Sequence, residues 1–174
     1  GEDRLAAFRQ RNIGFIFQSY NLMTSHTALE NVAMPLMFRG VPKAKREKIA
    51  AQMLREVGLE KRMHHRPNQM SGGQQQRVGI ARAFVASPKI IFADEPTGNL
   101  DSKTTMEVLR LMQRIVREQQ QTLVMVTHDN YIAGFADRQF HIVDGKILKI
   151  EEKKKETQEA VQEMQDALYR GEES

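Results

Sequence analysis

The chain contains no cysteine, and no apolar run in it approaches the length that crosses a bilayer. The lack of cysteine excludes a disulfide framework and a metal site built from thiolates. A transmembrane helix needs roughly 18 or more consecutive apolar residues, so any contact with a membrane would go through a partner protein. Aromatic residues are also scarce, at 6%, whereas charged residues reach 28%, which argues for a soluble surface.

Basic residues exceed acidic ones by only four (26 against 22), and the two kinds are interleaved along the chain. Nucleic-acid binding usually requires basic residues clustered on one face, so no nucleic-acid partner is expected. A length of 174 residues with 40% hydrophobic residues fits one domain of ordinary size. The first ten residues, Gly1–Gln10, are charged and do not begin with methionine, and we interpret them as a cut through a longer chain.

Three short apolar runs predict the strands of a central sheet: Ile13–Phe17, Ile90–Ala93 and Leu123–Thr127. Each run is nearly continuous in apolar residues, as in strands of a parallel sheet that is covered on both faces. Segments with helical periodicity separate the runs, which favours an α/β fold. We therefore expect a parallel sheet whose strands are buried on both faces.

Polar residues stand at the carboxyl end of each predicted strand: Gln18 at the first, Asp94 and Glu95 at the second, and His128 at the third. In open α/β sheets, ligands bind at this edge. Each residue taken singly also fits a plainer role, because Gln18 could merely close its strand and His128 could neighbour a helix N-cap. Three such coincidences on one edge favour a ligand site.

The Asp94-Glu95 pair stands before Pro96, which cannot extend the hydrogen-bonded ladder of a strand. A carboxylate at the end of a buried strand is unfavourable unless a cation or a donor meets it. Mg²⁺ carried by substrate phosphates would meet this need, with Asp94 as its ligand. Glu95 would face the other way and could orient or deprotonate an attacking water. The alternative is a surface turn that carries two acids.

The stretch from Met70 to Phe84 is typical of a turn that becomes a helix. Ser71 is the predicted N-cap, and Gly72 and Gly73 would let another molecule approach the backbone closely. The free amides and the positive dipole end of such a helix can bind an anion. Taken alone, the Ser-Gly-Gly sequence is better explained as an ordinary loop closed by a cap.

Two further helices are predicted between the first strand and this stretch. Thr27 and Glu30 form a predicted capping box for a short helix that Pro35 ends or bends. An amphipathic helix is predicted over Lys43–Val57, and Gly58 stops it.

After the second strand, either Asp101 or Ser102 is the predicted N-cap of another helix. An Asp-Gly turn at 144–145 predicts a hairpin over residues 140–150. Residues 151–174 are charged and rich in glutamine, and they are interpreted as a helical or partly disordered tail.

In their order along the chain, the polar motifs resemble the nucleotide-binding domain of ABC-type ATPases. The motifs that carry the resemblance are Gln18, Ser71-Gly72-Gly73-Gln74-Gln75, Asp94-Glu95, Asn99-Leu100-Asp101 and His128. Each motif is short, but five of them in the right order and spacing make the resemblance very specific. It covers residues 1–150, which we therefore predict to be a partial ATP-binding domain.

The resemblance implies a role for each residue of the sheet edge. Gln18 would be the Q-loop glutamine, near Mg²⁺ and the attacking water, and would link the site to a membrane partner. Asp94 would end the Walker B strand and bind the metal, and Glu95 would be the catalytic carboxylate. Asp101 would belong to the D-loop across a dimer interface, and His128 would be the switch histidine that contacts the γ-phosphate.

The residues from Met70 to Gln74 resemble the signature motif of the family, with Met70 in place of the usual leucine. In the family, Ser71, Gly72 and Gly73 would contact the γ-phosphate of ATP held by the opposite subunit, and Gln74 completes this ATP-binding motif. The resemblance therefore implies ATP and Mg²⁺ as cofactors and a homodimer with a second ATPase subunit.

A finer resemblance lies in Phe17–Met23 and Leu29–Leu36, which are similar to the subfamily of lipoprotein-releasing, macrolide-export and cell-division ATPases. In that subfamily the ATPase drives a separate membrane protein, often by a mechanical stroke. The resemblance therefore implies an integral membrane permease as partner. It also implies a cytoplasmic location, peripheral on the inner face of the cell membrane.

One feature of the family is missing, because no Gly-x-x-x-x-Gly-Lys-Ser/Thr loop, the phosphate cradle of P-loop chemistry, occurs in the chain. The simplest account is that the chain lacks the N-terminal portion of its domain. We therefore expect a P-loop NTPase-like α/β core, truncated at the N-terminus, with a helical signature subdomain at residues 25–87. Losing a central strand should expose a sheet edge and leave the core unfilled, so the chain alone should be marginally stable and bind ATP poorly.

Two functions of different classes remain open. In the first, the intact protein is an ATPase subunit that powers a transporter or an extrusion complex. In the second, the chain is a hydrolysis-incompetent module that engages a partner through its helical face and tail. A soluble relative acting on DNA or ribosomes is disfavoured, because the chain has no long coiled-coil insertion and no second ATPase half.

Overall fold

The computed structural model describes residues 1–153, and of Glu2 and Asp3 it describes the backbone alone. Contacts divide the chain into two compact units, Gly1–Val126 and a unit that begins at Thr127. The first unit contains α1 (Glu2–Asn12), β1 (Ile13–Phe17), α2 (Ala28–Phe38), α3 (Lys43–Glu56), the 3₁₀ turns η1 (Glu60–Arg62) and η2 (Pro67–Gln69), α4 (Gly72–Phe84), β2 (Ile90–Asp94), α5 (Ser102–Glu118) and β3 (Thr122–Val126). The second unit contains α6 (Asn130–Ala133), β4 (Arg138–Val143) and β5 (Lys146–Glu152).

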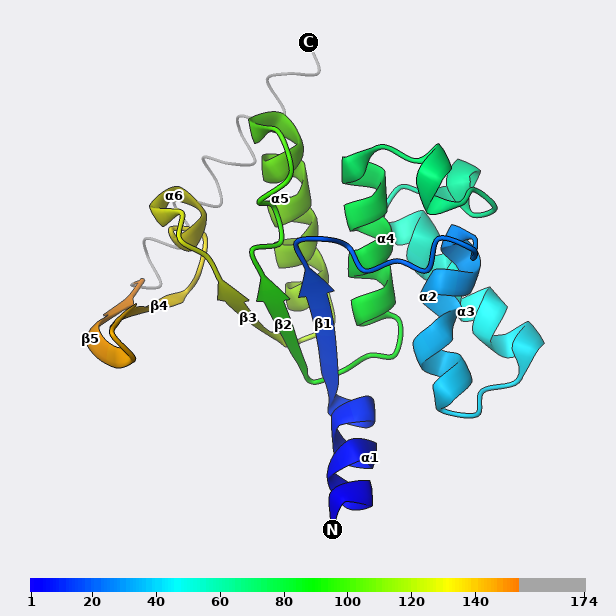
Figure 1. Ribbon diagram of the computed structural model, residues 1–174, viewed down its shortest axis with the longest axis horizontal. Helices are drawn as coiled ribbons and strands as arrows, with labels where there is room; N and C mark the ends of the chain where they lie inside the picture. The colour runs from blue at the N-terminus through cyan, green and yellow to red at the C-terminus, as the bar shows by residue number, and fades with distance from the viewer. Residues whose placement is uncertain (154–174) are drawn as a thin grey trace. The chain divides into compact units, whose positions relative to one another are not determined.

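The first unit is built on a three-stranded parallel sheet with the strand order β1-β2-β3. The register pairs Phe17 with Asp94 and Asp94 with Val126, so the carboxyl ends of the three strands lie level. Figure 1 shows α5 behind the strands, and α4 packs against β1. The predicted α/β fold is confirmed, and each predicted strand agrees with the structure to within one residue at either end.

The sheet is buried on one face only, so the expectation of strands buried on both faces was wrong. The covered face carries Ile16, Ile91 and Ala93, each with at most 1% of its surface exposed. The open face carries six large apolar side chains that are 37–61% exposed: Phe15, Phe17, Ile90, Phe92, Val124 and Val126. The faces differ because α4 and α5 both lie on the same side of the sheet (Figure 1).

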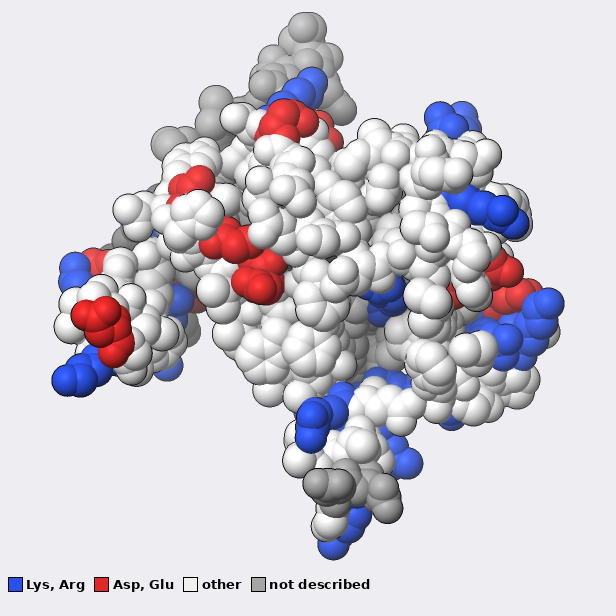
Figure 2. All heavy atoms as spheres, viewed as in Figure 1, with Lys and Arg blue, Asp and Glu red and all other residues white. Residues whose placement is uncertain are grey.

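Aromatic rings stack on the open face. The ring centroids of Phe15 and Phe17 are 5.9 Å apart, and those of Phe15 and Phe92 are also 5.9 Å apart. Figure 2 shows a broad uncharged surface over the three strands, with acidic side chains only where the strands end. Parallel sheets are normally covered on both faces, and large exposed apolar patches mark places where something else binds. This face therefore fits the expectation of an incompletely filled core.

The helices that follow β1 begin and end largely as predicted. The Thr27 hydroxyl accepts from the Glu30 amide (3.2 Å), and the Glu30 carboxylate accepts from the Thr27 amide (2.7 Å), which confirms the capping box. Pro35 does not end this helix, because α2 continues through it to Phe38. At the end of α3, Gly58 has a φ of +75°, a conformation that favours glycine.

The second unit confirms the predicted hairpin. β4 and β5 pair antiparallel, and the turn between them has positive φ at both Asp144 and Gly145, as a two-residue type I′ turn requires. β5 runs to Glu152, so the first two residues of the predicted tail belong to the hairpin. The rest of the tail, residues 154–174, lies outside the described residues, and its conformation stays a prediction.

Within residues 1–153, each helix is either too short or too polar to pass through a membrane.

Candidate functional site

The carboxyl edge of the sheet brings three of the predicted site residues together. Gln18 follows β1 directly, Asp94 is the last residue of β2, and Glu95 comes next in the chain. Because β1 and β2 are paired with Phe17 opposite Asp94, Gln18 and Glu95 leave adjacent strands at the same level. The sequence therefore predicted correctly that these residues lie at one edge of the sheet, and their roles stay a prediction.

Glu95 adopts a left-handed backbone conformation, with a φ of +42°. Its amide donates to the Val126 carbonyl (2.9 Å), and its own carbonyl accepts from the Gly98 amide (3.1 Å). A non-glycine residue with positive φ costs on the order of 1–3 kcal/mol and persists only where its surroundings hold it. Such strain is common at active sites, and no signal in the sequence pointed to it.

Asp94 lies on the open face, on the same side of β2 as Ile90 and Phe92, and it is exposed. The expectation that this carboxylate needs a cation to offset its desolvation was therefore wrong, because the side chain is exposed to water. Asp94 is nevertheless exposed at the sheet edge, and carboxylate oxygens suit a metal ion. Its role as a metal ligand stays a prediction.

The side chain of Gln18 lies over the loop that follows β2. Its Nε2 donates to Asn99 Oδ1 (3.4 Å), and Asn99 Nδ2 donates to the Gln18 carbonyl (3.1 Å). A Cβ at Gly98 would lie 2.5 Å from Gln18 Nε2, so this arrangement requires the glycine. The contact with Asn99 uses the amide nitrogen and leaves Oε1, the atom that can ligate a cation, outside it.

The oxygens of Asp94 and Gln18 are hard donors of the kind that Mg²⁺ prefers. Among the described residues, no group of three or more histidine, aspartate or glutamate side chains could hold a metal ion. Mg²⁺ usually keeps few protein ligands and shares the rest with phosphates and water. The residues present therefore fit Mg²⁺ only together with the phosphates of a nucleotide.

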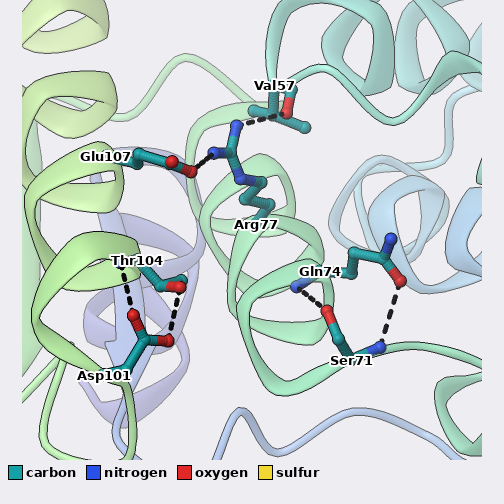
Figure 3. A network of polar contacts seen from close by, with 7 residues as sticks. All are labelled: Val57, Ser71, Gln74, Arg77, Asp101, Thr104 and Glu107. Atoms are coloured by element: carbon teal, nitrogen blue, oxygen red, sulfur yellow. Dashed lines mark hydrogen bonds and ion pairs between the residues drawn. The ribbon is translucent and has the colours of Figure 1, made fainter.

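The start of α4 is a capping box, drawn in Figure 3. The Ser71 hydroxyl accepts from the Gln74 amide (3.3 Å), and the Gln74 side-chain oxygen accepts from the Ser71 amide (3.0 Å). The predicted N-cap is thus confirmed. The amides of Gly72 and Gly73 belong to the first turn, whose N–H groups have no carbonyl acceptor within the helix.

The two glycines of this turn have a structural role that the sequence did not reveal. A Cβ at Gly72 would lie 2.9 Å from the Tyr20 hydroxyl, and a Cβ at Gly73 would lie 2.6 Å from Thr104 Cγ2. The room beside both α-carbons is therefore taken by the chain's own side chains, which corrects the expectation that it is open to another molecule. An anion could still reach the amides.

Asp101 is the N-cap of α5, which decides between the two predicted candidates, Asp101 and Ser102. Its carboxylate accepts from the Thr104 amide (3.0 Å) and from the Thr104 hydroxyl (2.6 Å), as Figure 3 shows. These two hydrogen bonds, the one from the hydroxyl first, lower the pKa of Asp101 below its ordinary value. Its predicted role across a dimer interface stays a prediction.

His128 belongs to the second unit, two residues after the end of β3. Asp129 is the N-cap of α6, and its carboxylate accepts from the amides of Tyr131 (2.8 Å) and Ile132 (3.3 Å). His128 thus has the plainer position that the sequence allowed, next to a helix N-cap. Its role as a switch residue at the γ-phosphate stays a prediction.

Two polar residues of α4 that join it to neighbouring segments were missed. Gln76 is fully buried on α4, and its Nε2 donates to the Pro96 carbonyl in the loop after β2. Arg77 donates to the Val57 carbonyl (3.2 Å) and to the Glu107 carboxylate (2.8 Å), and so joins the end of α3 to α5 (Figure 3). Gln76 lies on the apolar repeat of α4, four residues before Ile80, and that spacing could have revealed its burial.

Comparison with known proteins agrees with this fold. Residues 2–98 match the protein family described as ABC transporter. That match covers more than half of the chain, which belongs to this family.

The chain is similar to curated ATP-binding proteins along most of its length. It is 49% identical over 148 residues to the lipoprotein-releasing system ATP-binding protein LolD of Geobacter metallireducens, covering 85% of this chain and 66% of the relative. It is also 49% identical over 140 residues to LolD of Syntrophotalea carbinolica, covering 80% of this chain and 62% of the relative. The chain thus spans less than two thirds of the length of these relatives.

A larger relative shares the same region. The macrolide export ATP-binding/permease protein MacB of Bartonella henselae is 49% identical over 146 residues, which make up 84% of this chain and 22% of the relative. Among solved structures, the chain is similar to the dimeric bacterial ABC transporter cassette MJ0796, with a TM-score of 0.77 and 44% identity. The alignment covers 87% of this chain and 67% of that one, and it confirms the predicted cassette fold.

Proposed function

We propose that the full-length protein is the ATP-binding subunit of an ABC transporter of the lipoprotein-releasing or macrolide-export type. It hydrolyses ATP at a dimer interface and thereby drives an integral membrane permease. The observation that carries this proposal is Glu95, held with positive φ directly after β2 and next to Gln18 on the adjacent strand. The similarity to LolD and MacB supports the transporter type.

The residues of the sheet edge would divide the chemistry among them. Asp94 and the Oε1 atom of Gln18 would be ligands of Mg²⁺. When bound, this ion would offset the charge on the phosphates of ATP. Glu95 would accept a proton from the attacking water, because its carboxylate follows the strand and its backbone is held in place by the Val126 carbonyl. His128 would contact the γ-phosphate.

The start of α4 would act on the nucleotide of the second subunit. The first-turn amides at Gly72 and Gly73, together with Ser71 and Gln74, would meet the γ-phosphate at the positive end of the helix dipole. Asp101 would lie across the same interface. The similarity to a cassette solved as a dimer supports this arrangement. The assembly would sit on the inner face of the cell membrane, held there by its permease.

A second candidate function is favoured by two observations, one about the sequence and one about the structure. It contains no Gly-x-x-x-x-Gly-Lys-Ser/Thr loop to hold ATP phosphates, and one face of its sheet is open. In this second candidate the protein is a hydrolysis-incompetent interaction module that binds ATP poorly. The two candidates differ in whether the full-length protein turns over ATP.

The proposal is tested with the full-length protein and its Glu95→Gln variant. Loss of a general base lowers turnover by a factor of about 10²–10⁴, so ATP hydrolysis should fall by at least about 100-fold. ATP binding should be retained, because glutamine keeps the shape of the side chain. The measurements are steady-state phosphate release and nucleotide affinity by calorimetry.

The matched control is Glu56→Gln, which neutralises an exposed glutamate at the end of α3, away from the sheet edge. This variant should hydrolyse ATP at the parent rate. Undiminished hydrolysis in Glu95→Gln would reject the role of Glu95. A full-length protein that binds no ATP and releases no phosphate would reject the transporter ATPase and favour the interaction module.

A further inference from the structure

The loop that carries Gln18 turns sharply after β1 and is strained. Tyr20 and Asn21 both have positive φ, +60° and +47°, although neither is glycine. Two such residues in a row are unfavourable unless other groups hold them in place. The residue that holds this turn comes from α4.

Arg82 is the residue that holds the turn. Its Nη2 donates to the Tyr20 carbonyl (2.9 Å), and its Nη1 donates to the Asn21 carbonyl (2.7 Å). Burial of the Arg82 guanidinium lowers its pKa. A guanidinium presents its donors in a fixed planar fork. Because Arg82 donates to two carbonyls of one strained turn, it defines the shape of that turn.

Tyr20 also approaches α4 at two glycines of the helix. Its hydroxyl is 2.9 Å from the place that a Cβ would occupy on Gly72, the first residue of the helix. Its carbonyl is 3.7 Å from the corresponding place on Gly79, one turn before Arg82. Hydrogen bonds from Arg82 thus hold the loop against the C-terminal part of α4, and the Tyr20 hydroxyl lies close to the first residue of the same helix.

We propose that Arg82 and Tyr20 are positioning residues that fix Gln18 relative to the Ser71 cap at the start of α4. Gln18 lies two residues before Tyr20, and Ser71 lies one residue before Gly72. We call the contacts of Arg82 and Tyr20 between the Gln18 loop and α4 the joint. When the start of α4 in one subunit closes on the partner's nucleotide, the joint sets the position of Gln18 in the subunit's own site. The inference rests on the proposed function, in which the Ser71 cap and Gln18 serve two different nucleotides.

The chain offers a matched control in Arg39, which makes the same kind of contact at the other end of β1. Its guanidinium donates to the carbonyls of Gln10, Arg11 and Ala86, at 2.6–3.2 Å. Burial lowers the pKa of Arg39 too, and the charge of Arg11 adds to this effect. Substitution of Arg39 therefore shows how the loss of a partly buried arginine affects stability when the Gln18 loop is left unchanged.

The experiment uses the full-length protein with four variants: Arg82→Gln, Arg39→Gln, Gln18→Ala and the double variant Gln18→Ala/Arg82→Gln. Arg82→Gln should lower kcat for ATP by about tenfold and change KM by less than about twofold, because it removes positioning rather than ground-state binding. Arg39→Gln should lower the melting temperature about as much as Arg82→Gln does, and it should leave kcat within about twofold of the parent. In the Gln18→Ala background, Arg82→Gln should lower kcat by less than about twofold, since residues that act as a unit are not additive.

Equal losses of kcat with and without Gln18 would overturn the proposal, because Arg82 would then act independently of it. An equal loss in Arg39→Gln would overturn it as well, since general destabilisation would explain both. If Arg82→Gln fails to fold, Arg82→Lys replaces it. Lysine keeps the charge but lacks the fork that reaches two carbonyls, so the same pattern of kcat is expected.

A measurement without activity separates this proposal from the proposed function. The amides of Tyr20 and Asn21 donate within the turn, to the carbonyls of Phe17 and Ser19. Their hydrogen exchange should speed up by about tenfold in Arg82→Gln and stay unchanged in Arg39→Gln. Unchanged exchange in Arg82→Gln would overturn the joint even in an active enzyme. Faster exchange in a protein that hydrolyses no ATP would instead count against the ATPase and retain the joint.

Discussion

Alternate residues of the same three strands form the two faces of the sheet, yet the two faces differ in what covers them. Ile90 and Ile91 are neighbours in β2, and the first is 37% exposed while the second is 0% exposed. The difference lies in the helices, because α4 and α5 lie on the same side of the sheet (Figure 1) and Ile91 is on the buried face. An apolar run in a strand therefore reports that both faces are suited to burial, but not that both are buried.

One of the predicted site residues lies where the open face ends. Asp94 continues the row of Ile90 and Phe92, so the predicted metal ligand lies at the end of the open face. Gly14 belongs to the covered face, where a Cβ would lie 2.5 Å from the Ala83 carbonyl of α4. Close packing thus fixes the covered face, while the open face and the sheet edge beside Asp94 are accessible to other molecules.

The largest expected effect is a difference between two alanine substitutions at adjacent isoleucines. Ile91→Ala should lower the free energy of unfolding by about 2–5 kcal/mol, because it leaves a cavity in a packed core. Ile90→Ala should lower it by less than about 1.5 kcal/mol, because no closed cavity forms on an open face. Denaturant titration of the 174-residue chain measures both free energies.

Equal losses of unfolding free energy at the two positions would contradict the difference between the two faces. The same two substitutions in the full-length protein test this difference further. If a segment outside this chain covers the open face, the cost of Ile90→Ala should rise there towards that of Ile91→Ala.

An intermediate effect is expected from polar substitutions on the open face. Phe15→Ser and Phe92→Ser together should reduce the fluorescence of a dye that binds exposed apolar surface by roughly half. The reason is that they remove a stacked aromatic pair from the middle of this face. The control is Phe140→Ser, which removes a ring of similar exposure (50%) from β4 in the second unit. Equal reductions by the control would show that the dye does not favour the open face.

The smallest expected effect is a pH dependence of stability that comes from Asp101, the N-cap of α5 on the covered side of the sheet. Hydrogen bonds from Thr104 lower the folded-state pKa of Asp101 below its ordinary value of 3.8. A lowered pKa contributes stability that is present above 3.8 and is lost as the pH falls through the folded-state pKa. Asp101→Asn should therefore lower the melting temperature at pH 7, and its difference from the parent should shrink in acid.

Ser102→Ala is the control for this prediction, since Ser102 was the other candidate cap and carries no carboxylate. The difference between Ser102→Ala and the parent should not change with pH below 4, a range chosen to include the titration of Asp101. A constant difference for Asp101→Asn over the same range would show that its carboxylate does not stabilise α5.

The sequence predicted those features that depend on neighbours along the chain. The strands, the capping box at Thr27, the N-cap at Ser71, the stop at Gly58 and the turn at 144–145 agree with the structure because each depends on hydrogen bonds or φ angles within a few residues. The order of polar residues after the strands predicted the edge where Gln18 and Glu95 meet. Position alone sufficed there, since parallel strands in register bring their carboxyl ends together.

The tertiary structure decided what depends on contacts across the chain. Which face of the sheet is covered, the partners of Arg82 and Gln76, and the side chains that fill the space beside Gly72 and Gly73 all involve residues 20 or more positions apart. The positive φ of Glu95 belongs to this group, because the Val126 carbonyl of the adjacent strand holds it. Sequence determines local geometry through short-range hydrogen bonding and sterics, whereas burial and strain depend on which distant segments the fold brings into contact.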